Sequence, residues 1–311
     1  YIQACALVEA VRKSEYCMVG GRSIGIGTTV ADPSQWARIF GTSFDHADQM
    51  EVCLRAEKID TDRVARHLDW WKAQVNIQLG SRFTSQSLAL RDMAEERGYD
   101  FLGLKCQQEM SDHYALQCLA VALLNNDCDA DGPKVPIPTS CECDCDGALT
   151  MRILSLACGG VPSCLVDIKF FGEETPGFIL ANCGAMAPYF ADPVGGCYKG
   201  VTMMPHTFGL AGGGATQMIA APGPVTVARL FRTKGAYVLG CFEGHAVMKP
   251  IEELRKTTWC YPHQFIEADV DYNLFLHTMN SNHLHSVYGN CKGVLQQFCG
   301  MVGIQFIDYN K

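Results

Sequence analysis

Hydrophobic and polar residues follow two alternating patterns along the first half of the chain. Short apolar runs, each bounded by polar or Gly/Pro residues, are typical of buried strands; they fall at 15–21, 101–106, 135–141 and 162–171. Between them, apolar residues recur with the period of amphipathic helices, and those segments are 32–41, 60–80, 85–98, 111–127 and 146–160. This alternation of strand and helix predicts an α/β fold with a doubly wound parallel sheet.

The pattern changes after about residue 170. Short β-rich runs separated by glycine and proline replace the helices, at 177–184, 216–222, 225–232 and 236–242. This texture predicts an antiparallel, barrel-like sheet. We therefore expect a Rossmann-like α/β domain over 1–158 and a β-rich C-terminal domain over 159–311 that carries part of the active site.

Composition narrows the class of protein. The 311 residues include 48% hydrophobic side chains, enough for sizeable cores, and 33 acids against 25 basic residues give a net charge of −8. With no Lys/Arg block, a nucleic-acid or membrane surface is not expected, which leaves small-molecule chemistry. No secretory leader and no apolar run near the ~18 residues of a membrane span are present, so the sequence favours a cytoplasmic protein.

Two acids end neighbouring predicted strands. Glu142 follows the strand 135–141, and Asp167 lies at the end of the next strand in the sequence. If these strands are parallel neighbours joined by a right-handed crossover, both carboxylates emerge at the same sheet edge, where they can bind a divalent ion and move protons. The alternative is that Glu142 caps a helix and Asp167 is a surface acid.

Cysteine and histidine offer further candidates for a site. Cys141, Cys143 and Cys145 flank the first acid, but this spacing is not that of a zinc knuckle, and we expect most of the 17 cysteines to be reduced and buried. His283 and His285 lie two apart and share a face if the run is extended, so one of them can complete a metal site. Alternatively, both are structural.

Several separated stretches together resemble the L-fucose isomerase family, which is related to the L-arabinose isomerases. They occur in family order at 19–32, 107–114, 139–151, 165–171, 177–185, 208–232, 241–245, 256–263 and 281–290. The resemblance implies a metal-dependent aldose-ketose isomerase that acts on L-fucose, D-arabinose, L-arabinose or a similar sugar through an enediolate. It also implies a homo-oligomer, either a trimer or a hexamer. Members of the family carry an additional α/β domain ahead of the region where this sequence begins.

The resemblance assigns roles to individual residues. Glu142, Asp167 and His283 match the family's ligands for a divalent cation, typically Mn²⁺, and the two acids match its acid/base pair. Residues implied to contact the sugar are Gln107, Glu109, Asn182, Trp259 and Asn282.

Three other readings remain open on the sequence alone. The first is an isomerase of a modified sugar, and the second is a sugar-binding or regulatory relative that has lost turnover. The third is a redox or zinc protein, which rests only on the number of cysteines.

Overall fold

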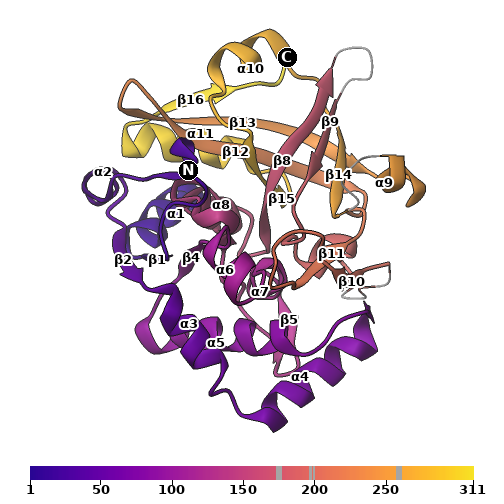
Figure 1. Ribbon diagram of the computed structural model, residues 1–311. Coiled ribbons are helices and arrows are strands. Elements are labelled where there is room, and N and C mark those ends of the chain that lie inside the picture. Colours follow the sequence, from indigo (N-terminus) through magenta and orange to yellow (C-terminus); the bar gives the residue numbers. More distant parts are fainter. Residues whose placement is uncertain (173–176, 196–197, 199, 257–260) are drawn as a thin grey trace.

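Four short strands form a parallel sheet in the first half of the chain, in the order β2-β1-β4-β7 (Figure 1). The computed structural model describes residues 1–172, 177–195, 198, 200–256 and 261–311. The strands of this sheet are Glu15–Val19 (β1), Ser43–Ala47 (β2), Phe101–Leu104 (β4) and Thr139–Ser140 (β7). The segments between and around them are Ile2–Arg12 (α1), Gly27–Thr29 (η1), Pro33–Ile39 (α2), Gln49–Ala56 (α3), Thr61–Gln74 (α4), Arg82–Arg97 (α5), Glu109–His113 (α6), Cys118–Leu124 (α7) and Cys145–Ala157 (α8).

Helices cover both faces of this sheet. Successive strand residues point to opposite faces, so Tyr16 packs in one hydrophobic cluster with α1, α2 and α8, while Cys17 packs in another with α3, α5 and α7. The predicted doubly wound α/β arrangement is thereby confirmed.

The helix expected over 111–127 is instead divided into α6 and α7. Between them the backbone N–H of Leu116 donates to the carbonyl of Gly212, 2.9 Å away, and that of Gln117 donates to the sulfur of Cys106. These tertiary hydrogen bonds replace helical ones, which is why the apolar period continues across a break.

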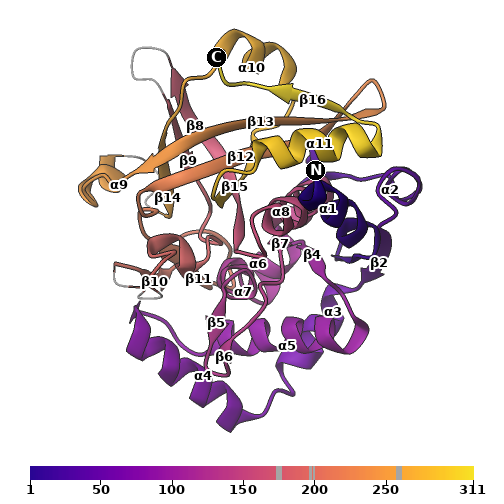
Figure 2. The ribbon, with the colours of Figure 1, turned by 180° about the vertical axis from the view of Figure 1, so that it is seen from behind.

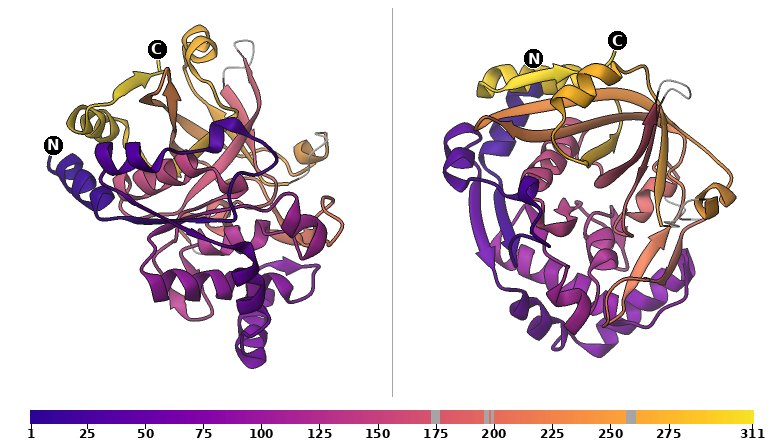
Figure 3. Two further views of the ribbon diagram at one scale, coloured as in Figure 1. Left: turned by 60° about the vertical axis from the view of Figure 1, so that its left-hand side comes forward. Right: turned by 45° about the horizontal axis from the view of Figure 1, so that its top comes forward.

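Seven strands in the second half form a mostly antiparallel sheet, in the order β12-β15-β8-β9-β14-β13-β16. Because β12 also pairs with β13, the sheet closes on itself, as the predicted barrel-like arrangement requires (Figure 3). The strands are Ser163–Gly172 (β8), Gly177–Ala181 (β9), Gly223–Thr233 (β12), Ala236–Val247 (β13), His263–Glu267 (β14), His283–Tyr288 (β15) and Gln305–Asp308 (β16). The helical segments are Pro188–Ala191 (η3), Glu252–Lys256 (α9), Tyr272–Thr278 (α10) and Lys292–Val302 (α11), and Figure 2 shows α11 beside α1.

Strands from the two halves of the chain pair with each other, and both halves contribute to one hydrophobic core. Asn76–Ile77 (β3) pairs with Thr202–Pro205 (β10), which in turn pairs with Gly214–Gln217 (β11). Cys128–Asp129 (β5) and Gly132–Pro133 (β6) form a separate two-stranded sheet. The expected boundary after residue 158 lies between α8 and β8, but one hydrophobic cluster includes Trp71 from the first half and Val166 from the second. The division into two domains stays a prediction.

The helices in the described part of the chain are all too short or too polar to span a membrane.

Candidate active site

Glu142 lies in a tight turn at the end of the parallel strand β7. The 3₁₀ turn Cys141–Cys143 (η2) separates β7 from α8, and within it Glu142 and Cys143 have φ values of 58° and 51°. Non-glycine residues rarely adopt this left-handed conformation, and such residues cluster at functional sites. The Ser140 hydroxyl donates to the carbonyl of Asp144, 2.7 Å away, and so closes the turn.

Asp167 and His283 lie directly opposite each other on neighbouring antiparallel strands. They are register partners in the β8–β15 pair, so their side chains share one face of the sheet. The adjacent Asn282 donates its side-chain amide to Asp167 Oδ1, 3.0 Å away. Strand pairing therefore fixes both side chains next to the turn that carries Glu142.

The three residues that sequence similarity singled out meet around the imidazole. His283 Nε2 is 3.1 Å from Glu142 Oε2 and 3.7 Å from Asp167 Oδ1. The histidine side chain is buried, whereas the side chains of Glu142 and Asp167 keep 19% and 22% of their surface exposed. A small molecule can therefore reach the carboxylates while the imidazole stays held from behind.

The route by which the two acids meet differs from the expected one. The strands that precede Glu142 and contain Asp167 are not parallel neighbours: β7 belongs to the parallel sheet, while β8 pairs with β9 and β15 in the closed sheet. Asp167 also lies within β8 rather than at its end. The expected parallel pairing was wrong because the chain leaves α8 to begin a new antiparallel sheet.

Burial and mutual proximity shift the pKa values of this group. Burial raises the pKa of Asp167 to about 6; the nearby charge of His283 opposes this effect, and the Glu142 carboxylate adds a smaller increase. Burial disfavours the charged imidazole, but hydrogen bonds to Asp144 and Glu142 outweigh it and raise the pKa of His283 to about 10. Negative charge from two sides therefore favours a positive group at this position.

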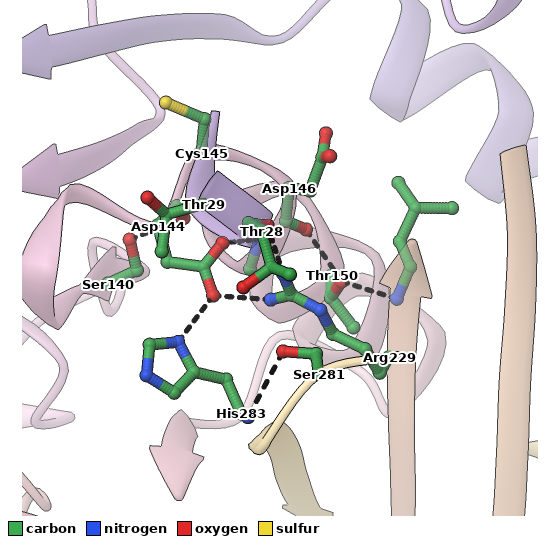
Figure 4. A network of polar contacts seen from close by, with 12 residues as sticks. Thr28, Thr29, Ser140, Asp144, Cys145, Asp146, Thr150, Arg229, Ser281 and His283 are labelled. Atoms are coloured by element: carbon green, nitrogen blue, oxygen red, sulfur yellow. Dashed lines mark hydrogen bonds and ion pairs between the residues drawn. The ribbon is translucent and has the colours of Figure 1, made fainter. Parts of the chain in front are cut away.

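A second set of polar residues lies behind the imidazole (Figure 4). His283 Nδ1 is 2.8 Å from Asp144 Oδ2, and the same oxygen accepts a hydrogen bond from Arg229 Nη1. Asp144 also caps α8, with Oδ1 accepting from the backbone N–H of Gly147. Its other partners lie 85 and 139 residues away, so no local pattern reveals them.

The remaining candidate residues lie in different surroundings. Asn282 contacts Asp167, as described above. Asn182 uses its side chain to hold the backbone, accepting from Gly184 N–H and donating to the carbonyl of Leu165. Glu109 forms an exposed ion pair with Lys105, 2.7 Å apart, and the Gln107 carbonyl accepts from the hydroxyl of Ser23. Trp259 lies outside the described residues. The sugar-contact roles of all five stay predictions.

The cysteines near Glu142 belong to the core. Cys141, Cys143 and Cys145 are at most 3% exposed, and every cysteine in the described part of the chain carries a free thiol. Cys141 Sγ lies 3.6 Å from Cys183 Sγ, which is in turn 3.7 Å from Cys118 Sγ. The expectation of mostly reduced, buried cysteines is confirmed for these residues.

A second cluster with the same ligand types lies elsewhere. Among the described residues, His67, Asp129 and Asp131 form a group of three whose ligand atoms all lie within 4.8 Å of one another, a spacing that fits a divalent cation. However, Arg91 is 2.6 Å from Asp129 and 2.7 Å from Asp131, and Arg66 is 2.7 Å from Asp131. The guanidinium groups already neutralise both carboxylates, so we interpret this cluster as a structural ion-pair network.

Fold and site together define a class: an α/β protein joined to a closed antiparallel sheet, with two carboxylates and a histidine positioned for small-molecule chemistry. The comparison with known families is more specific. Residues 180–310 match the C-terminal domain of L-fucose isomerase, and this similarity points to an isomerase. The match includes His283 but neither Glu142 nor Asp167. No curated protein matches the chain significantly.

Proposed function

We propose that the protein is a metal-dependent aldose-ketose isomerase acting on L-fucose, D-arabinose, L-arabinose or a similar sugar. The observation that carries the proposal is the convergence of Glu142, Asp167 and His283, with 3.1 and 3.7 Å from the imidazole to the two carboxylates. The family match of residues 180–310 supports the same reaction class, and it covers His283 but neither of the two acids.

The donor set fits a divalent cation. Two carboxylates and one imidazole nitrogen are suitable ligands for Mn²⁺ or a similar ion, and here both carboxylates lie near the same imidazole nitrogen and are partly exposed. Glu142, Asp167 and His283 would hold the ion. When bound, it would polarise adjacent oxygens of the open-chain sugar and acidify the hydrogen at C2.

The protein's own residues supply the proton transfers. Either Glu142 or Asp167 would take the proton from C2 as a general base, and a carboxyl group would return a proton to C1. The proton of the C2 hydroxyl would pass to the former aldehyde oxygen, so that the aldose becomes a ketose through an enediolate. The buried His283 would act as a ligand only. Asn282, which hydrogen-bonds Asp167, would limit the rotation of that carboxylate.

Isomerase assays with Mn²⁺ and a panel of aldoses test the proposal. We expect ketose formation from at least one of the three named sugars, and at least a 100-fold loss of kcat in Glu142→Gln with sugar binding retained. Sugar binding without turnover in the wild-type protein would instead favour the sugar-binding reading. An active Glu142→Gln/Asp167→Asn double variant would contradict the mechanism.

A further inference from the structure

We propose that Asp144 is a positioning residue, which orients His283 and directs its Nε2 lone pair toward the metal position, and that Arg229 holds Asp144 in place. This inference rests on the proposed function, because it takes His283 as a ligand through Nε2. It adds a functional role for two residues that neither the sequence nor the family match assigned.

The contact with Asp144 determines the tautomer of His283. An ionised carboxylate only accepts hydrogen bonds, so the 2.8 Å contact between Asp144 Oδ2 and His283 Nδ1 requires the proton on Nδ1. The neutral imidazole then has its lone pair on Nε2, the nitrogen that faces Glu142 at 3.1 Å. Ligating histidines commonly donate their second ring N–H to a carboxylate, which fixes the ring and strengthens the ligand.

Arg229 compensates the buried negative charge of Asp144. Its side chain and that of Arg229 are both 0% exposed, and an unpaired carboxylate there would be strongly destabilised. Arg229 supplies the compensating charge through Nη1, while its Nη2 donates to the carbonyl of Thr28, 2.9 Å away. Both terminal nitrogens of the guanidinium group are thus hydrogen-bonded, and its charge keeps Asp144 ionised in the interior.

The first turn of α8 sets the direction of the Asp144 carboxylate. Asp144 Oδ1 accepts from Gly147 N–H at 2.9 Å, so the first turn of α8 fixes the plane of the side chain. A β-carbon on Gly147 would lie 2.6 Å from both Asp144 and His285, so the absence of a side chain permits this packing. On the other side, the backbone N–H of His283 donates to the Ser281 hydroxyl, 3.1 Å away (Figure 4). The serine contact holds the backbone at His283, and the imidazole itself is only 2% exposed, so the surrounding packing limits its rotation.

Asp144→Asn tests the inference with Asp146→Asn as a matched control. Both acids are buried at the start of α8, but Asp146 accepts from Trp36 and Tyr237 and makes no contact with His283 that the structure records. The asparagine amide at 144 can donate to Nδ1, which would place the ring proton on Nε2 and block the lone pair. Calorimetric titration with Mn²⁺ alone should therefore show affinity reduced 10- to 100-fold in Asp144→Asn and changed less than about 3-fold in Asp146→Asn.

Circular dichroism would verify that both variants are folded. If Asp144→Asn does not fold, Arg229→Lys serves instead: it keeps one charge but loses the second anchor, and we expect a smaller loss of Mn²⁺ affinity, about 3- to 10-fold. Folded variants at both positions with unchanged affinity would overturn the inference alone. A wild-type protein that binds no Mn²⁺ would overturn the proposed function and this inference together.

Discussion

Two clusters in this protein contain the same ligand types but differ in their surroundings. In the described part of the chain, no arginine pairs with Glu142 or Asp167, the two acids beside His283. By contrast, Arg91 and Arg66 pair with Asp129 and Asp131, the two acids beside His67. The pKa of Asp167 is raised to about 6, while that of Asp131 is held well below its usual range by two arginines despite its partial burial. The close spacing of the ligand atoms favours His67, Asp129 and Asp131, the second cluster, as a cation site. The unneutralised negative charge of the two acids favours Glu142, Asp167 and His283, the first cluster.

The largest expected effect separates the clusters by activity. In Glu142→Gln/Asp167→Asn we expect isomerase activity to fall at least 100-fold, because both candidate acid/base groups are lost. Steady-state kinetics with saturating Mn²⁺ would measure this. The matched variant Asp129→Asn/Asp131→Asn, provided that it is folded, should retain wild-type kcat. Loss of activity in the matched variant alone would exchange the roles of the two clusters.

Removal of one arginine should reveal the structural role of the second cluster. The Arg91 and Asp129 side chains are 12% and 10% exposed, so Arg91→Met leaves the Asp129 carboxylate without its arginine, whereas Asp131 keeps Arg66. The substitution should lower the free energy of unfolding by about 3 kcal/mol. Urea denaturation would show this loss. A stable Arg91→Met protein would mean that the arginine does not neutralise this cluster.

The clusters should also differ in the sign of their pH dependence. In metal-free protein, the raised pKa of Asp167 gives stability that is present below pH ~4 and lost as the pH rises through about 6, by at most about 3 kcal/mol. The lowered pKa of Asp131 gives stability that is present above pH ~4 and lost as the pH falls. Denaturation of Asp167→Asn and Asp131→Asn from pH 3 to 7 should show differences from wild type that change in opposite directions.

Cation binding should stabilise the protein through the first cluster only. At Mn²⁺ 100-fold above its dissociation constant, the free energy of unfolding should rise by about 2.7 kcal/mol over protein in a chelator. This increment should disappear in Glu142→Gln and persist in Asp131→Asn. Melting curves with and without the chelator would measure it; persistence in Glu142→Gln would place the cation elsewhere.

The sequence predicted the secondary-structure elements better than it predicted how the strands pair. The apolar runs 15–21 and 101–106 predicted β1 and β4 correctly, because a strand buried on both faces of a sheet has a continuous apolar sequence. The parallel pairing expected for the strands at Glu142 and Asp167 was wrong, because sheet membership depends on partners such as β15, more than 100 residues away. Local pattern carries no information on such long-range pairing.

The same limit explains the residues that sequence reasoning did not find. Asp144 satisfies a local rule as a helix cap, and nothing in its neighbourhood indicates that Arg229 and His283 converge on it. Conversely, the eye-catching cysteines at 141, 143 and 145 are buried packing residues. Sequence similarity selected Glu142, Asp167 and His283 where spacing left alternatives open, and their roles as ligands stay predictions.

The central claim is that the cation binds at the first cluster, and anomalous diffraction from crystals soaked in Mn²⁺ tests it most directly. The account predicts one strong peak about 2.0–2.5 Å from Glu142, Asp167 and His283 Nε2, with His283 Nδ1 still bonded to Asp144. A peak between His67, Asp129 and Asp131, or on the cysteine sulfurs, would contradict it.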